Sequence, residues 1–155
     1  MPATISDRLT ELGIVLPQAA APAANYVPFL HLDGILYVSG QLPMEDGKIA
    51  CSGTLGAGVT TDEGQKAARL CAINILAQAQ AALGDLENIR QVVRLTGFVN
   101  SASDFGDHPA VINGASDLLV DVLGARGRHT RAAVGVANLP FGCSVEIDAM
   151  IATKN

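Results

Sequence analysis

The order of helix-like and strand-like segments constrains the fold of this chain more than any other feature. Residues 60–83 carry small and apolar side chains at helical spacing, with a capping box at Thr60 and Glu63 and a stop at Gly84. Residues 107–124 repeat this pattern, and strand-like runs lie before, between and after the two helices. This order predicts an α+β fold in which two helices cover one face of a mixed sheet. The other face is then left to solvent or to a partner.

Turn signals set the limits of the strand-like runs. Asp33 and Gly34 separate two β-rich segments and form the strongest hairpin signal in the chain. A brief strand is expected near residues 48–51, and a long one over residues 89–100. Together with the two helices, these runs predict a mostly antiparallel or mixed sheet.

The first 24 residues are expected to form an N-terminal extension. A short helix is predicted to begin at the cap residue Ser6 and to end at Gly13, followed by a Pro/Ala-rich connector over residues 17–24. A chain of 155 residues is long enough to bury one core, so residues 1–155 are expected to form a single domain.

Composition excludes several classes of partner. Only 16% of the residues are charged and 49% are hydrophobic, which suggests that other subunits cover part of the surface. The net charge of −5, without a Lys/Arg run, argues against a nucleic-acid partner, and no apolar run approaches the roughly 20 residues that span a membrane. The three cysteines and three histidines lack metal-ligand spacing, so no metal or cofactor and a cytoplasmic location with reduced thiols are expected.

The last two strand-like runs carry opposite charges. If they pair as a hairpin about residues 139–140, Arg131 lies opposite Asp148 and Ala133 lies opposite Glu146, all on the face without helices. A solvated Arg131–Asp148 ion pair, stabilising by less than ~1 kcal/mol, is what the spacing alone favours. The alternative is a site in which the guanidinium holds the carboxylate of a small acid and Glu146 holds a water.

Other candidate residues also admit two interpretations. Ser39 and Gly40 could offer backbone N–H groups to an anion or form a plain turn. Tyr26 could cover a ligand or simply pack, and Asn113 is either an exposed amide or a ligand contact. Gly114 lies inside a helix, where glycine costs about 1 kcal/mol relative to alanine, and so indicates a close approach of two backbones.

Four segments, residues 25–44, 92–105, 111–114 and 130–152, together resemble the RidA/YjgF family, also called endoribonuclease L-PSP. The most specific match is the final R-x-x-V-x-V-x-x-L-P stretch with the V-E-I that follows it, and the longer N-terminus resembles a longer-chain branch. The resemblance implies a chorismate-mutase-like fold with a six-stranded sheet backed by two helices. It also implies a homotrimer with an inner barrel and clefts between subunits. The implied activity is hydrolysis of reactive enamines and imines to 2-oxo acids and ammonia, without a cofactor.

The resemblance assigns roles to single residues. Arg131 matches the arginine that holds the substrate carboxylate, and Glu146 matches the acid that positions the attacking water. The matching residues that line the cleft or lie near the water are Tyr26, Ser39, Gly40, Asn113 and Ala133. Ala133 stands where well-known members have cysteine, so thiol chemistry is not expected there. Gly135 and Asn138 replace a glutamate and an arginine of the signature, which bears on the range of substrates.

Several functions compete. The first is a hydrolase of C=N bonds similar to 2-iminobutanoate/2-iminopropanoate deaminase, with a small carboxylate as its substrate. A trimer that binds small acids, or acts as a chaperone, without catalysis is the second. A chorismate-mutase-like isomerase would need several cations for a dicarboxylate, and only Arg131 is evident. Ribonuclease activity is disfavoured because the chain is acidic and lacks a His/Lys pair for phosphodiester cleavage. The presence of both Arg131 and Glu146 favours the deaminase.

Overall fold

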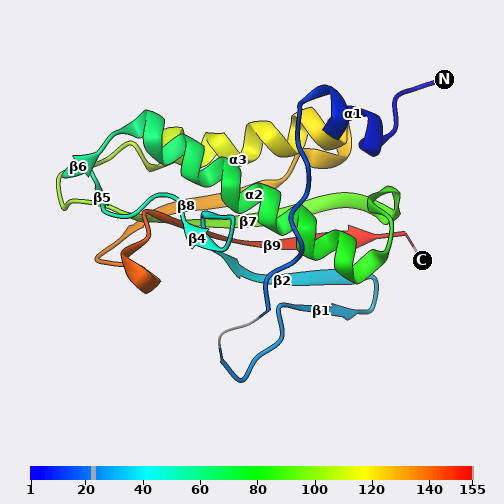
Figure 1. The fold of residues 1–155 in the computed structure, drawn as a ribbon, viewed down its shortest axis with the longest axis horizontal. Coiled ribbons are helices and arrows are strands. Elements are labelled where there is room, and N and C mark those ends of the chain that lie inside the picture. The colour runs from blue at the N-terminus through cyan, green and yellow to red at the C-terminus, as the bar shows by residue number, and fades with distance from the viewer. Residues whose placement is uncertain (22–23, 155) are drawn as a thin grey trace.

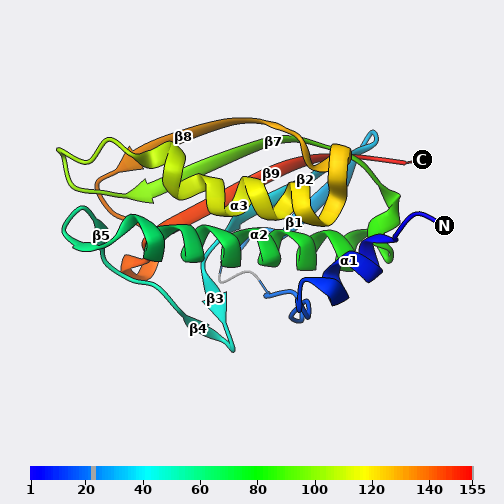
Figure 2. The same cartoon turned by 90° about the horizontal axis from the view of Figure 1, so that it is seen from above.

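The computed structural model describes residues 1–21 and 24–154. A five-stranded mixed sheet forms one layer, and two long helices lie side by side on one of its faces (Figures 1 and 2). The strands, in their order across the sheet, are β1 (Phe29–Leu32), β2 (Ile35–Gln41), β9 (Val145–Thr153), β7 (Ile89–Asn100) and β8 (Thr130–Val136). The two helices are α2 (Thr61–Leu83) and α3 (His108–Leu123). The predicted α+β arrangement is confirmed.

The main sheet has five strands where six were expected. Two small two-stranded ribbons lie outside this sheet, and one of them touches the chain just after β7 through a single bridge between Leu55 and Ser101. The ribbons are β3 (Met44–Glu45) with β4 (Lys48–Ile49), and β5 (Thr54–Leu55) with β6 (Gly58–Val59). Three 3₁₀ turns complete the elements: η1 (Leu86–Asn88), η2 (Gly124–Gly127) and η3 (Pro140–Gly142). The strand expected near residues 48–51 therefore exists as β4 but joins β3 instead of the sheet.

Local sequence signals correctly predicted both ends of α2 and the turn between β1 and β2. Thr60 and Glu63 form the expected capping box of α2, and Gly84 ends the helix with φ 76°. Asp33 and Gly34 both adopt positive φ in the two-residue turn between β1 and β2, as a hairpin of this kind requires. The core between the sheet and the two helices contains fully buried side chains from both layers, among them Leu36, Ile75, Leu119, Ile147 and Ile151.

The predicted hairpin between the last two strands is wrong. β8 pairs only with β7, in parallel, whereas β9 lies between β2 and β7 and is antiparallel to both. Residues 137–144 carry the chain past β7 to this central position. β9 is the more apolar strand and has its helix-facing side chains fully buried there, while β8 can remain at the edge because it is only partly buried.

This topology places the two predicted site residues on opposite faces of the sheet. Arg131 is in register with the buried residue Leu95 of β7, and so it lies on the side of the helices. Glu146 is in register with Phe98, one residue out of phase with the buried side chains of β9, and so it lies on the side without helices. The expectation that both residues share the uncovered face is therefore wrong.

The N-terminal helix α1 (Ile5–Glu11) begins two residues earlier than expected. Its cap is Thr4 and not Ser6: the Thr4 hydroxyl accepts from the Asp7 N–H at 3.1 Å, and the Asp7 carboxylate accepts from the Thr4 N–H at 2.9 Å. This reciprocal capping box also lowers the pKa of Asp7. Sequence reasoning missed it because it took the hydroxyl nearest the apolar run as the cap.

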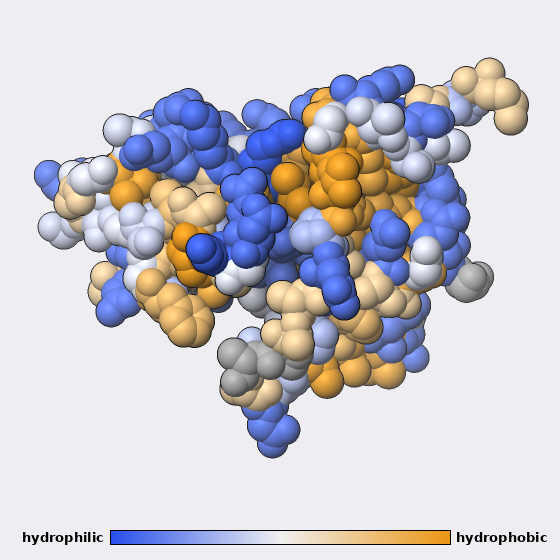
Figure 3. Space-filling view, viewed as in Figure 1, coloured by the Kyte–Doolittle hydropathy of each residue, from blue (hydrophilic) through white to orange (hydrophobic). Residues whose placement is uncertain are grey.

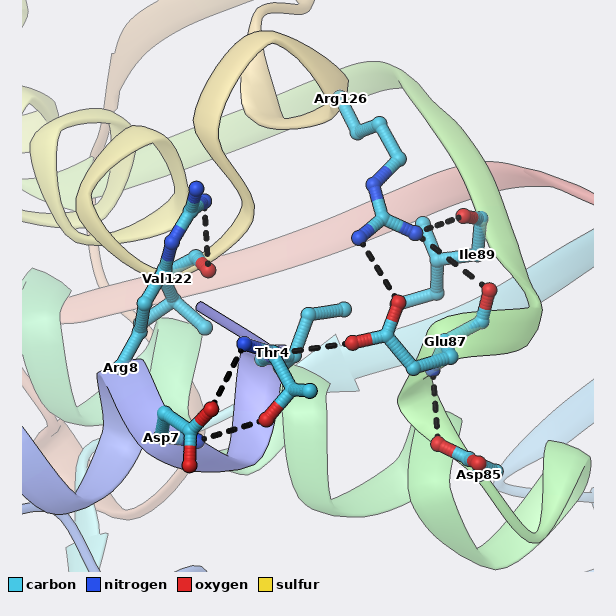
Figure 4. A network of polar contacts seen from close by, with 9 residues as sticks. Thr4, Asp7, Arg8, Asp85, Glu87, Ile89, Val122 and Arg126 are labelled. Carbon is cyan, nitrogen blue, oxygen red and sulfur yellow. Dashed lines mark hydrogen bonds and ion pairs between the residues drawn. The ribbon is translucent and has the colours of Figure 1, made fainter. Parts of the chain in front are cut away.

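Side-chain contacts fasten α1 to the rest of the molecule (Figure 4). The Ile5 N–H donates to a Glu87 carboxylate oxygen at 2.8 Å, and the other carboxylate oxygen pairs with Arg126 at 3.0 Å. The bond from Ile5 and then that from Arg126 lower the pKa of Glu87. On the other side of α1, Arg8 donates to the Val122 carbonyl at the end of α3 at 3.4 Å. Among the residues that the structure describes, no helix is long and apolar enough to cross a membrane.

The two long helices approach closely at Gly114, as its position inside a helix indicates. A Cβ on Gly114 would overlap the backbone carbonyl of Gln65 in α2. The Gln65 side chain adds a bridge by donating to the Ala110 carbonyl of α3 at 2.9 Å.

Replacing Gly114 by alanine is therefore expected to destabilise the protein. The helix propensity of alanine contributes about 1 kcal/mol, but overpacking against a backbone atom costs about 1–3 kcal/mol, and a carbonyl cannot rotate away as a side chain can. Urea unfolding should show a lower midpoint with an unchanged slope. Gly106→Ala is the matched control, because no atom lies within 4 Å of the added Cβ and its φ is not positive. Equal midpoints for the two variants would contradict the close approach.

Candidate functional site

A cavity of about 680 Å³ opens beside the end of β2. In Figure 3 the surface is hollowed between the segment before β1, at the bottom of the view, and the loop before β9, at the lower left. Residues from five parts of the chain line it, among them Tyr26, Ser39, Gly40, Gln78, Phe141 and Glu146. Four of these, Tyr26, Ser39, Gly40 and Glu146, are candidate residues of the sequence analysis.

A bulge in β2 forms one wall of this cavity. The register between β2 and β9 shifts between Val38 and Gln41, so Ser39 and Gly40 leave the regular ladder. The Ser39 hydroxyl donates to the Val27 carbonyl at 2.8 Å, which ties the segment before β1 to the bulge. Ser39 therefore shapes the cavity through this bond, and its hydroxyl proton is used in the bond to Val27.

Glu146 contributes a half-buried carboxyl group to the cavity wall. Burial raises the pKa of this carboxyl, and the negative charge of Asp148 raises it further. Gly40 lies against it: a Cβ on Gly40 would be 2.5 Å from a carboxylate oxygen of Glu146. The absence of a side chain at Gly40 thus makes room for the carboxyl. Within residues 1–21 and 24–154, neither of the two ion pairs includes this group.

Arg131 lies at the β8 edge of the sheet, where it is held against α3. Its guanidinium donates to the Ser116 hydroxyl at 3.0 Å and to the Pro109 carbonyl at 3.2 Å. The ring of His129 continues this chain, with Nε2 at 2.9 Å from the Ser116 oxygen and Nδ1 at 2.6 Å from the Gly127 carbonyl. Since a carbonyl only accepts, Nδ1 carries a proton, and in the neutral ring Nε2 accepts from Ser116. The expected pair with Asp148 is not formed, because β7 separates the two strands.

The candidate residues therefore form two groups in one chain. Tyr26, Ser39, Gly40 and Glu146 line the cavity. Arg131 and Ala133 lie on β8, and Asn113 is exposed on α3 beside that strand. No lining residue of the cavity belongs to β8 or α3, so one chain does not bring the two groups together.

The surroundings of Gly135 explain one departure from the family signature. A Cβ on Gly135 would lie 2.5 Å from the His108 ring and 2.6 Å from the Ser101 hydroxyl, which are themselves 3.1 Å apart. A glutamate at this position would collide with this pair, so glycine suits its surroundings.

Burial raises the pKa of Cys143 to about 11, with a smaller effect of Glu146. Its thiol therefore stays protonated and is a poor nucleophile.

Sequence reasoning missed Gln78 and Phe141. Gln78 is 1% exposed and reaches the cavity from α2. Gln78 lies three residues after Ile75 and four before Ala82, so helical spacing places it on the same apolar face of the helix, and this spacing could have identified it from the sequence. Phe141 lies at the cavity with 77% of its surface exposed and a positive φ of 59°. A non-glycine residue in that conformation is uncommon and is not evident from sequence.

Comparisons with known proteins agree with this architecture. Residues 6–150 match the model of the family described as "YjgF/chorismate mutase-like, putative endoribonuclease". The Trypanosoma cruzi protein TCP17 is 51% identical over 152 residues, which cover 97% of this chain and 95% of that protein. The structure of Atu1372 from Agrobacterium tumefaciens, a protein of unknown function, is 57% identical with a TM-score of 0.92, covering 97% of this chain and 92% of that one.

A more distant structure contains a ligand. TdcF from E. coli, solved with bound serine, is 27% identical with a TM-score of 0.65, and the match covers 89% of this chain and 94% of TdcF. The family match spans nearly the whole chain, including β2, both long helices and the Arg131 and Glu146 strands. The chain belongs to the YjgF/chorismate-mutase-like family.

Proposed function

We propose that this protein hydrolyses reactive imines and enamines of small amino acids to 2-oxo acids and ammonia. The observation that carries the proposal is the Glu146 carboxyl, half-buried in a cavity wall and with a raised pKa. A carboxylate whose pKa is raised toward the working pH is suited to act as a general base on a water. The serine bound to the family member TdcF supports a small amino-acid-like ligand.

The reaction needs only water and proton transfers. An enamine first takes a proton at carbon and becomes the imine. Water then adds to the carbon of the protonated imine and passes one proton to Glu146 as the C–O bond forms and the C=N π electrons move to nitrogen, which gives a carbinolamine. Glu146 returns this proton to the nitrogen. As the C–N bond breaks, ammonia leaves, the hydroxyl proton passes to solvent and the carbon becomes the ketone of a 2-oxo acid. Atoms and electrons balance without an oxidant or reductant.

The proposed clamp for the substrate carboxylate is Arg131 of a second copy of the chain. The reason is geometric: Arg131 and Glu146 lie on opposite faces of the sheet, and the cavity lacks a residue from β8. A homotrimer with clefts between its subunits would bring the two groups together. Apolar side chains that are 41–54% exposed on the uncovered face support such an assembly: Leu30, Leu32, Tyr37 and Val134. Light scattering that shows a stable monomer at micromolar concentration would contradict it.

A direct assay tests the proposed reaction. An L-amino-acid oxidase generates the imine in solution, and the release of 2-oxo acid is followed with and without the protein. We expect faster release with the wild-type protein, and no acceleration with Glu146→Gln. If the wild-type oligomer binds 2-oxo acids but does not accelerate their formation, the protein is a small-acid-binding module and not a hydrolase.

Replacing Gly40 by alanine tests the placement of Glu146. The added methyl group would displace the carboxyl, since its Cβ would lie 2.5 Å from the nearer oxygen and 2.9 Å from the carboxyl carbon. A shift of this size is expected to lower turnover by about 10- to 100-fold. The midpoint of urea unfolding should change little, because the Glu146 side chain can rotate away. Wild-type turnover in Gly40→Ala, with Gly106→Ala as the control, would show that Glu146 acts from another position.

A further inference from the structure

Gln78 lines the cavity from α2 and has a buried, unpaired polar atom in its side chain. Its side chain is 1% exposed, and its amide nitrogen donates to the Ala20 carbonyl at 2.9 Å. The amide oxygen, Oε1, is buried and has no hydrogen-bond partner among the residues that the structure describes. The hydrogen bond to the Ala20 carbonyl also identifies which atom of the Gln78 amide is the nitrogen and which is the oxygen. A carbonyl only accepts, so a flipped amide would set two oxygens against each other. An acceptor is therefore what Gln78 offers.

A buried acceptor without a partner is rare in folded proteins and costs free energy. Packing alone does not account for it, because α2 is otherwise filled at this level by alanine, leucine and isoleucine. Much of the cavity wall is apolar, with Leu42, Met44 and Phe141 among its residues. Ligand sites are commonly apolar, and the few polar groups in their walls determine which ligand is bound.

We infer that Gln78 recognises a hydrogen-bond donor, such as a hydroxyl or amide N–H, on the side chain of the substrate. The inference rests on the proposed function for the reaction, and it names the class of substrate. With the carboxylate and the C=N group held near Glu146, the substrate side chain extends toward α2 and places its donor against Oε1. A side-chain carboxylate would be disfavoured there, since it would face both the amide oxygen and the charge of Glu146.

Two shape-matched substrates test this specificity. L-Homoserine carries a hydroxyl where L-norvaline carries a methyl group. 5-Hydroxynorvaline and norleucine differ in the same way, with a side chain that is one methylene group longer. The imines are made from each by an amino-acid oxidase. For at least one pair we expect kcat/KM for the hydroxyl member to exceed that of its partner by about tenfold or more. Gln78→Met should abolish or reverse that preference. Gln80→Met, on the exposed side of the same helix, is the matched control and should keep it.

Binding measurements keep the two proposals separate. Calorimetric titration of the wild-type protein with 4-hydroxy-2-oxobutanoate and 2-oxopentanoate, and with the longer pair of 2-oxo acids, needs neither a variant nor turnover. Tighter binding of a hydroxyl member without any imine hydrolysis would overturn the proposed function and leave the role of Gln78 intact. Hydrolysis with equal kcat/KM and equal affinity within both pairs would overturn the role of Gln78 and leave the proposed function intact.

Discussion

Replacing Glu146 by glutamine is expected to remove most of the turnover while leaving substrate binding largely unchanged. Glutamine keeps the shape of the side chain against Gly40, but it cannot take a proton from water. General-base catalysis contributes about 10²- to 10⁴-fold, so kcat should fall by that order with KM little altered. The imine assay measures both values. A variant with the wild-type kcat would exclude Glu146 as the base.

The same substitution should make the fold more stable at neutral pH. Burial and the charge of Asp148 raise the pKa of Glu146, which means that the folded state favours the protonated form. The stability that Glu146 contributes is thus present below the ordinary glutamate pKa and is lost as pH rises through the raised value. Glutamine resembles the protonated form at every pH. The Glu146→Gln variant should therefore have the higher urea midpoint at pH 7, and this difference should shrink as the pH is lowered.

The pH profile of turnover provides an independent check. Activity should fall on the acid side as Glu146 becomes protonated, at a higher pH than for an ordinary glutamate. Asp148→Asn removes one of the two causes of the raised pKa and should move this acid limb to lower pH. A limb that does not move in this variant would assign the titration to a different group.

Elements whose signals are local could be predicted from the sequence. The capping box at Thr60, the stop at Gly84 and the turn at Asp33 each depend on residues within a few positions, and each is found where expected. β7 also spans residues 89–100 as expected. The close approach at Gly114 was predictable because a glycine inside a helix already suggests a steric reason.

Features that depend on distant contacts could not be predicted in the same way. The charge pattern of the last two strands fits a hairpin, but burial of the more apolar strand at the centre of the sheet decides the pairing. That choice moves Arg131 to the opposite face from Glu146. The role of Gln78 depends on a carbonyl that is 58 positions away in the sequence, at Ala20. Strand-to-strand and connector-to-helix contacts of this kind leave little trace in local periodicity.

Removing the guanidinium of Arg131 is expected to weaken productive binding. Two of its five N–H groups are used on α3, so three remain for a substrate carboxylate. A lost charge-assisted contact costs about 2–3 kcal/mol, so kcat/KM for Arg131→Ala should fall by roughly 30- to 150-fold. Arg128→Ala, at an exposed position on the same edge, is the control and should retain the wild-type value. An Arg131→Ala variant with wild-type kcat/KM would exclude the clamp.

Mixing the two inactive variants tests whether Arg131 and Glu146 act from different copies of the chain. In an assembly of Arg131→Ala and Glu146→Gln subunits, a site that takes its base from one subunit and its clamp from the next can be intact. Random mixing of equal amounts makes about one quarter of such sites fully wild-type. Co-expressed variants should therefore recover about a quarter of the wild-type activity, although each alone is nearly inactive. If both residues belonged to one chain, every site would lack one of them, and mixing would restore nothing.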